Sequence, residues 1–334
     1  MTRVIHLVVG PQRHGVVRFG RALYDAMARV QAGSSLRHYR QFDEIDFAAD
    51  GSGVHVQFTD RVFGRTPEEA ARAVSAIVAA AERAGGRVTA TLHDLPQPSD
   101  GRNYPRRLAA YAHVCARVHA VVVSSEHEFE LLKPYAPHRT AVVPLPIAAL
   151  HHTDPVAAQS LSIAVFGFVY PGKGHLEVLA AIAHMAENIE LIAIGAASPG
   201  HDDLVADLTR RAQASQVRFR LTGHVPDGAV AAMLRGVTIP IAPHRHVSAS
   251  GSINSWLAAG RRPLAPVNRY TEELMLRNPD ALELYPDTEV GLRTAIKRAV
   301  DEPLLTWLPQ ATVLAPSPEQ AAAQYARLLT QWHR

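Results

Sequence analysis

The sequence contains a single cysteine, Cys115, among its 334 residues, and this excludes any disulfide bond within the chain. It has no apolar run near the ~18 residues that a membrane-spanning helix needs. Its N-terminus enters a strand-like pattern directly, without the apolar region of a signal peptide. We therefore expect a cytoplasmic protein without a transmembrane segment, and peripheral contact with a membrane stays open.

The excess of positive over negative charge is small as well. The formal net charge is +3 and the basic residues are scattered rather than grouped, so the sequence gives little support to nucleic-acid binding. Only three of the 34 Lys and Arg residues are lysines, namely Lys133, Lys173 and Lys297. Frequent Ala, Arg and Val residues suggest a bacterial genome rich in G and C. A lysine in a glycine-rich turn, as at Lys173, indicates that a compact point charge is preferred there.

The length allows two domains of ~100–200 residues each. Strand-like and helix-like segments alternate through both halves of the chain, which predicts the α/β class. A polar, proline-containing stretch at 148–160 separates the halves and is typical of a linker. A final helix is expected over 318–332 after a long loop, far enough along the chain to pack back on the first half.

Residues 162–182 predict a strand, a glycine-rich turn and a helix. The sequence pattern Gly167-x-x-x-x-Gly172-Lys173 matches most of a P-loop, but Gly174 replaces the Ser or Thr that would hold magnesium. The dinucleotide fingerprint Gly-x-Gly-x-x-Gly is absent. The element therefore suits a diphosphate without a tightly held metal ion.

Three further groups could bind or act on a ligand. His93 and Asp94 follow the predicted strand 87–92, and ligands of open parallel sheets bind beyond the carboxyl ends of strands. A histidine beside a carboxylate can orient or polarise a hydroxyl, although a purely structural pair is equally open. The loop 10–15 could approach an anionic or sugar ligand, or could be a solvated turn. Residues 250–252 start a helix and form a second candidate anion site.

The order of these motifs resembles that of the GT-B glycosyltransferases, in particular retaining glycosyltransferase family 4. The resemblance covers essentially the whole chain. It implies two Rossmann-like domains facing each other across a cleft, with the C-terminal helix returning to the first domain. The implied boundaries are 1–147 for the acceptor-side domain, 148–160 for the linker, 161–316 for the nucleotide-sugar domain and 317–334 for the returning helix. The matching motifs are His93-Asp94, Val142-Val143-Pro144, Gly167 to Gly174, Thr222-Gly223-His224-Val225, Ala258 to Pro263 and the C-terminal helix.

By this resemblance Lys173 would neutralise the donor diphosphate, and His93 with Asp94 would lie beside the transferred sugar. Residues 223–225 would border the base. The reaction would retain the anomeric configuration, with neither a bound metal nor a cofactor, and the only small molecules would be the nucleotide-sugar and the acceptor. The implied donor-binding residues are Gly167, Gly172, Lys173, Gly223, His224, Val225, Ser250, Gly251, Ser252, Asn254 and Ser255.

Two departures from the family pattern affect the donor site. The arginine that usually precedes the lysine is replaced by the segment 168–170, Phe-Val-Tyr. The two usual glutamates are replaced by Val247 and Ser255, so the groups at 250–252 and 254–255 would have to hold the sugar, phosphate or ribose. Possible contacts to the diphosphate or the acceptor are Arg13, His14, Gly15, Arg18 and Arg245.

The sequence therefore predicts a hexosyltransferase of the EC 2.4.1 type. It would move a hexose from a nucleoside diphosphate sugar to a sugar or glycan acceptor. GDP-mannose, and thus a mannosyltransferase, is the first expectation, and UDP-glucose is the second. Two alternatives remain: a noncatalytic module of the same fold that binds glycan or nucleotide, and a sugar-nucleotide epimerase. The acceptor, the linkage and the oligomeric state are open.

Overall fold

The structure is a computed structural model that describes residues 3–30, 33–47, 50–136, 139–148, 155–156, 158 and 160–334. It divides into two compact units. The first unit consists of Met1–Pro146 and Pro316–Arg334, and the second of Ile147–Ala315. Most of the predicted linker, at 149–154, 157 and 159, lies outside the described residues.

The first unit is built on a six-stranded parallel sheet in the order β2-β1-β3-β4-β5-β6. The chain moves from β1 to β2 on one side and then crosses to β3 on the other, so the strand order reverses between β1 and β3. Strands β1, β3 and β4 are buried throughout, which explains their apolar runs. The strands are β1 (Val4–Val9), β2 (Ser35–Tyr39), β3 (Gly53–Phe58), β4 (Val88–Leu92), β5 (Ala120–Val123) and β6 (Thr140–Val142).

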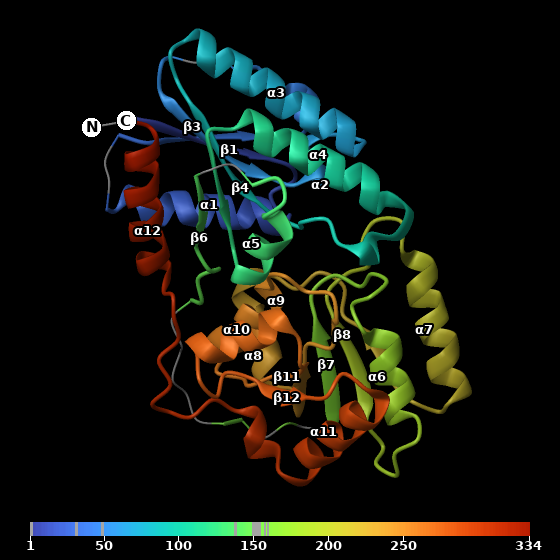
Figure 1. Cartoon of the computed structure of the whole chain (residues 1–334). Helices are drawn as coiled ribbons and strands as arrows, with labels where there is room; N and C mark the ends of the chain where they lie inside the picture. Colours follow the sequence, from blue (N-terminus) through green and yellow to red (C-terminus); the bar gives the residue numbers. More distant parts are fainter. Residues whose placement is uncertain are drawn as a thin grey trace. The chain divides into compact units, whose positions relative to one another are not determined.

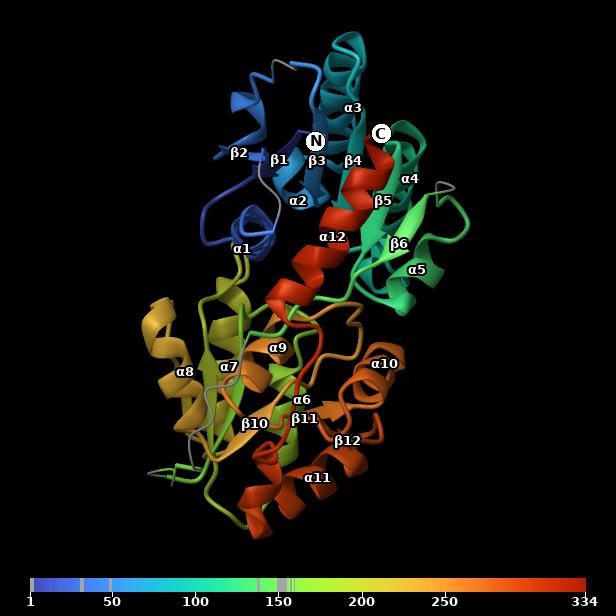
Figure 2. The ribbon, with the colours of Figure 1, turned by 90° about the vertical axis from the view of Figure 1, so that its left-hand side faces the viewer.

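Helices cover both faces of this sheet (Figures 1 and 2). On one face, Tyr325 and Leu329 of the C-terminal helix α12 pack with Leu23 and Met27 of α1. The predicted return of this helix to the first domain is therefore confirmed. The other face carries α3 and α4, and Cys115 of α4 is buried in that core. The helices are α1 (Gly15–Ala28), α2 (Asp60–Phe63), α3 (Pro67–Arg83), α4 (Tyr104–Arg117), α5 (Glu126–Leu132) and α12 (Pro318–Trp332), with short 3₁₀ turns η1 (Phe42–Glu44) and η2 (Pro98–Asn103).

Helix α3 begins with a side-chain cap at Thr66. The Thr66 hydroxyl accepts a hydrogen bond from the Glu69 amide, and Pro67 occupies the first helical position, where no amide donor is needed. The Glu69 carboxylate accepts from the amide of Arg65 rather than from that of Thr66, so it reaches one residue further back than a capping box requires. The N-terminus of α3 is therefore capped by Thr66 without a reciprocal bond from Glu69.

The second unit repeats the design with a parallel sheet in the order β12-β11-β10-β7-β8-β9. Here the chain winds from β7 to β9 in one direction and then from β10 to β12 in the other, so the reversal falls between β7 and β10. The strands are β7 (Ser162–Phe166), β8 (Glu190–Ile194), β9 (Phe219–Leu221), β10 (Ile239–Ile241), β11 (Leu264–Pro266) and β12 (Glu283–Tyr285).

Residues of α6, α7 and α11 form one core of the second unit, and residues of α8, α9 and α10 contribute to two others. The expectation of a long loop before the final helix is wrong, because β11, α10, β12 and α11 fill that stretch. Strands of three residues are too short to show alternation, and α10 is largely polar on its outer side. The helices are α6 (His175–Ile182), α7 (Asp202–Ala214), α8 (Asp227–Arg235), α9 (Gly251–Ala258), α10 (Arg269–Arg277) and α11 (Glu289–Asp301), followed by the 3₁₀ turn η3 (Pro303–Thr306).

These two parallel sheets with helices on both faces confirm the predicted α/β class. Over the described ranges, no helix is both long enough and apolar enough to cross a bilayer.

Candidate functional site

Most of the predicted donor residues lie where the strand order of the second unit reverses. The turn after β7 carries Lys173, and the loop after β10 leads into the N-terminus of α9. Because β7 and β10 are paired neighbours, their carboxyl ends bring the two loops together. A reversal point of this kind is the usual ligand crevice of an open parallel sheet.

Lys173 is the central cation of this region. Its side chain is buried, its Nζ donates to the Ser252 hydroxyl at 2.9 Å, and its ammonium lies 5.9 Å from the centre of the Tyr170 ring. In the part of the chain that the structure describes, no carboxylate forms an ion pair with it. Burial lowers the pKa of Lys173 to about 8. A buried ammonium with one neutral partner is poised for an anion, because burying an unpaired charge costs free energy that an anion would offset.

The glycines of the β7 turn bring this lysine close to the neighbouring loop. Gly174 has φ +94° and caps α6, and a Cβ there would lie 2.6 Å from Cγ of Pro243. Gly167 has φ +112°, and a Cβ there would lie 3.5 Å from Nζ of Lys173. Both positions therefore need glycine for their backbone conformation, and Gly174 needs it also for the close approach of the two loops.

The second loop places hydroxyl groups at the start of α9. Ser250 caps the helix, since its Oγ accepts from the amide of Ile253 at 3.2 Å. The same Oγ lies 3.0 Å from the Ser252 hydroxyl and 3.2 Å from Nε2 of His244. Gly251 is exposed, and a Cβ there would meet no atom within 4 Å. The N-terminus of α9 thus presents hydroxyls and amides beside Lys173.

The two positions where the family has glutamates contain no carboxylate, and the structure shows what the replacements do. Val247 is buried and packs with Ile253 and Leu257 in a core of the second unit. The Ser255 hydroxyl donates to the carbonyl of Gly251 at 2.9 Å. Asn254, the other predicted contact, is buried. Val247 is therefore a core residue, and Ser255 is engaged within its own helix.

The remaining predicted donor residues follow β9. Gly223 adopts φ +69°, His224 is exposed, and Val225 packs with Leu234 and Trp256 in a core. The side chain of Val225 therefore faces inward. Gly172, in the β7 turn, adopts φ +86° with open space around its Cβ position.

The proposed cationic contacts lie in different surroundings. Arg245 forms an ion pair of 2.7 Å with Asp287, within the second unit. Arg13 and Arg18 are exposed near the start of α1, in the first unit.

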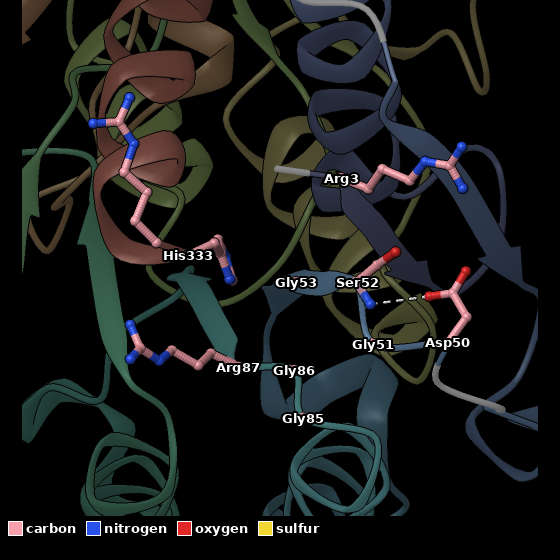
Figure 3. Close-up of a pocket in the computed structure, with 10 residues that line it drawn as sticks. Arg3, Asp50, Gly51, Ser52, Gly53, Gly85, Gly86, Arg87 and His333 are labelled. Carbon is pink, nitrogen blue, oxygen red and sulfur yellow. Dashed lines mark hydrogen bonds between the residues drawn. The ribbon is translucent and has the colours of Figure 1, made fainter. Parts of the chain in front are cut away.

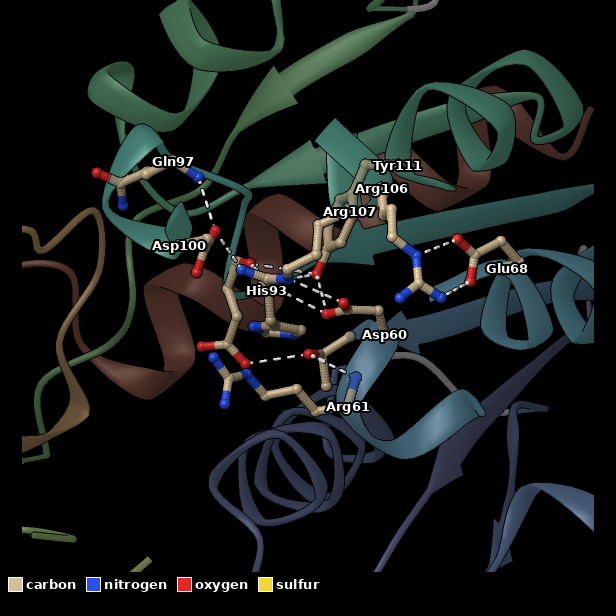
Figure 4. A network of polar contacts seen from close by, with 11 residues as sticks. Asp60, Arg61, Glu68, His93, Gln97, Asp100, Arg106, Arg107 and Tyr111 are labelled. Carbon is tan, nitrogen blue, oxygen red and sulfur yellow. Dashed lines mark hydrogen bonds and ion pairs between the residues drawn. The ribbon is translucent and has the colours of Figure 1, made fainter. Parts of the chain in front are cut away.

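In the first unit, His93 and Asp94 directly follow β4, as predicted, and Figure 4 shows His93. Nε2 of His93 lies 2.9 Å from Oε1 of Gln57, and its ring packs edge-on against Phe19. Burial lowers the pKa of His93 to about 4, so the ring is neutral near pH 7. Asp94 has φ +52°, and its Oδ2 accepts from the Thr59 hydroxyl at 3.1 Å.

His14, a predicted residue of the first loop, interacts electrostatically with His93 and Asp94. His14 caps α1 through Nδ1, which accepts from the amide of Val16 at 3.3 Å, and Gly15 is the first helical residue. Burial lowers the pKa of His14, and the charges of Asp94 and Arg61 shift it in opposite directions. His14 also lowers the pKa of His93. The structure therefore brings His14, His93 and Asp94 together at the carboxyl ends of the strands of this sheet.

A buried network that the sequence did not predict holds this backbone. Arg107 of α4 donates to both carboxylate oxygens of Asp60 at 2.8 and 2.9 Å, to Asp100 at 2.6 Å and to the carbonyl of Asp94 at 2.6 Å (Figure 4). The Tyr111 hydroxyl donates to the carbonyl of His93. The sequence offered one signal for this network, because Arg107 and Tyr111 are four positions apart on a helix face that is otherwise apolar.

Two cavities lie away from these groups. A cavity of about 400 Å³ is lined by Arg3, Gly53, Arg87 and His333, at the amino ends of β1, β3 and β4 (Figure 3). His93 lies at the opposite end of these strands, where β4 ends. Another, of about 610 Å³, lies around Met185 and Lys297. Across the described residues, no three His, Cys, Asp or Glu side chains form a group that could hold a metal ion.

No protein-family model matches the chain, and no curated protein matches it either. Solved structures do match. HepE from Anabaena in complex with UDP-glucose has a TM-score of 0.73 at 13% identity, over 99% of this chain and 98% of that chain. Sucrose-phosphate synthase from Thermosynechococcus elongatus has a TM-score of 0.71 at 14% identity, over 99% and 97%. AviGT4, a glycosyltransferase involved in avilamycin A biosynthesis, has a TM-score of 0.56 at 14% identity, over 98% and 97%.

Similarity at such low identity establishes the fold and leaves membership of family 4 as a prediction. The chain has the two-unit α/β fold of the GT-B glycosyltransferases.

Proposed function

We propose that this protein is a glycosyltransferase that moves a hexose from a nucleoside diphosphate sugar to a sugar or glycan acceptor. The observation that carries the proposal is the buried Lys173 ammonium at the reversal point of the second sheet. It has a hydroxyl partner and, within the described residues, no carboxylate partner. A diphosphate is the ligand that this charge and the start of α9 would suit together.

The chemistry needs a group that stabilises the departing nucleoside diphosphate. Lys173 and the amides at the start of α9 would supply positive potential where negative charge develops, without a metal ion. Gly174, which replaces the hydroxyl residue of a magnesium-binding loop, supports that expectation. His93 is neutral near pH 7 and would hydrogen-bond a sugar hydroxyl. Retention of the anomeric configuration is part of the proposal and rests on the resemblance to family 4.

UDP-glucose is the donor to test first. HepE, a structure similar to this one, was solved with UDP-glucose bound. GDP-mannose, the first expectation from the sequence, is the second donor to test. The base and sugar contacts would come from the loop after β9 and from the hydroxyls at 250–255.

The experiment measures the release of nucleoside diphosphate from each donor. In the absence of an acceptor, a transferase hydrolyses its donor slowly, so UDP or GDP should accumulate with wild-type protein. The anomeric proton signal of the released sugar then reports retention or inversion. No release from any donor, by a protein that still binds UDP, would favour a noncatalytic binding module.

The alternative function, a noncatalytic binding module, rests on a specific observation. Val247 is a core residue and Ser255 bonds its own helix, so neither replaces a glutamate near the donor. A module that binds nucleotide without turning it over would show this pattern. Donor hydrolysis separates the two readings, because binding alone releases no product.

A further inference from the structure

A chain of four polar side chains runs inward from Lys173. Its Nζ donates to Ser252 Oγ at 2.9 Å, Ser252 Oγ lies 3.0 Å from Ser250 Oγ, and Ser250 Oγ lies 3.2 Å from Nε2 of His244. His244 is buried, and its Nδ1 has no hydrogen-bond partner among the residues that the structure describes. The chain therefore ends at a ring nitrogen whose hydrogen can be present or absent.

The number of available hydrogens allows the hydrogen bonds between the two serines and His244 to run in either of two directions. Each serine hydroxyl has one hydrogen to donate and two lone pairs to accept with. The Ile253 amide occupies one lone pair of Ser250, and the Lys173 ammonium occupies one of Ser252. The hydroxyl hydrogens must therefore both point toward His244 or both point away from it.

The state of Nε2 of His244 selects the direction. When Nε2 carries no hydrogen, Ser250 donates to it and Ser252 donates to Ser250, so no hydroxyl hydrogen remains for a ligand. When Nε2 carries the hydrogen, it donates to Ser250, Ser250 donates to Ser252, and the Ser252 hydrogen is free to point toward an anion at Lys173.

The groups that face His244 keep its ring neutral in both directions. Burial lowers the pKa of His244, and the charges of Lys173 and His175 lower it further. Tyr270 of α10, whose hydroxyl accepts from the Ser250 amide, brings no charge. A change of direction is thus an exchange between two neutral forms of the ring. One hydrogen leaves Nδ1 to water and one arrives at Nε2 from water, with no net proton uptake.

We propose that His244 is a positioning residue that, in the form with a hydrogen on Nε2, turns the Ser252 hydroxyl toward a diphosphate held by Lys173. This inference rests on the proposed function and deepens it. It adds a neutral donor beside the lysine, at a site where the family's second cation is missing.

A double-mutant cycle on UDP affinity, measured by calorimetry, tests the coupling. Ser252→Ala should weaken UDP binding about fivefold to tenfold, the scale of one neutral hydrogen bond. His244→Leu should weaken it by a similar factor, and the double variant should be no weaker than Ser252→Ala alone. His244→Gln, whose amide nitrogen can donate to Ser250, should bind nearly as well as wild type.

His175→Leu is the matched control. His175 is also a buried histidine near Lys173, but in the described part of the chain neither of its ring nitrogens has a hydrogen-bond partner. Its effect on UDP affinity should therefore be the same with or without Ser252. Unfolding midpoints of all variants, measured in parallel, identify any variant that loses its fold.

A spectroscopic signature separates positioning from packing. The ¹⁵N shifts of the His244 ring should show the hydrogen on Nε2 when UDP is bound, and uridine, which lacks the diphosphate, should not produce that state. Additive effects of His244→Leu and Ser252→Ala, or a ring state unchanged by UDP, would overturn the inference. Absence of UDP binding by wild-type protein would overturn the proposed function as well, and so the two failures are distinguishable.

Discussion

Lys173 and Ser252 are 79 positions apart in the chain, yet the lysine ammonium donates to the serine hydroxyl at 2.9 Å. Lys173 lies in the turn after β7, and Ser252 lies in the first turn of α9, which follows the loop after β10. Strands β7 and β10 are the adjacent strands at which the sheet order reverses. This pair joins the two candidate anion sites that the sequence suggested separately. It also leaves the lysine charge to be neutralised by a ligand.

The first prediction concerns pH. Burial lowers the pKa of Lys173 to about 8, and only its protonated form attracts a diphosphate. UDP affinity should therefore be present below pH 8 and should fall above it, by up to about tenfold per pH unit. Lys173→Arg keeps a charge that does not titrate in this range, and its residual affinity should stay flat. An equal decline in Lys173→Arg would show that another group titrates.

Each half of this site could be predicted from the sequence, but the contact between the halves could not. The glycine-rich turn and the helix start are local patterns, set by backbone conformation and capping. Which loops meet depends on strand order, and strand order is decided by tertiary packing of β10 against β7. The sequence also could not show that Val247 faces a core, because its neighbours there come from α9 and beyond.

The second prediction concerns the network beneath His93. Arg107→Met would leave Asp60 and Asp100 without their buried partner, and removing one member of a buried ion pair costs about 3–5 kcal/mol. The free energy of unfolding of the first unit should fall accordingly in denaturant titrations.

The neighbouring Arg106 provides the control for that experiment. It forms an exposed ion pair with Glu68, and exposed pairs contribute little to stability (Figure 4). Arg106→Met should leave the unfolding midpoint nearly unchanged. Similar losses in both variants would mean that the Arg107 network does not stabilise the unit more than a surface pair does.

The third prediction assigns His93 to turnover rather than to nucleotide binding. His93 lies in the first unit, and the proposed diphosphate site lies in the second. His93→Ala should lower kcat by a factor on the order of 10² and leave the Kd for UDP unchanged. His113→Ala, at a surface histidine bonded to Ser75, is the control. Parallel losses of UDP affinity and turnover in His93→Ala would identify a structural histidine.

The end of β4 was predictable because an apolar run stops at a polar pair. The conformation of Asp94 was not. Its positive φ is held by Thr59 and Arg107, which belong to other elements. Likewise, β11 and β12 were missed, and their pairing with neighbouring strands rather than their sequence pattern makes them strands.

The fourth prediction ranks two changes at the start of α9. Gly251 is exposed with open space around it, so Gly251→Val should fold and should obstruct the approach of a phosphate to the helix amides. Ser255→Ala removes a hydroxyl that already bonds the Gly251 carbonyl. Gly251→Val should therefore weaken UDP binding more. The reverse ranking, with both variants folded by circular dichroism, would place the ribose contact on Ser255 and move the diphosphate elsewhere.

The most direct test of the account is a calorimetric titration of UDP into wild-type protein, Lys173→Met and Lys297→Met. Lys297 is an exposed lysine that pairs with Glu187 and Asp301, so it controls for the loss of a lysine charge. Charge-assisted hydrogen bonds contribute ~1.5–3 kcal/mol, so Lys173→Met should weaken UDP binding about tenfold to a hundredfold. Wild type and Lys297→Met should bind equally. Undiminished binding by Lys173→Met, or no binding by wild type, would contradict the proposal that Lys173 holds the donor diphosphate.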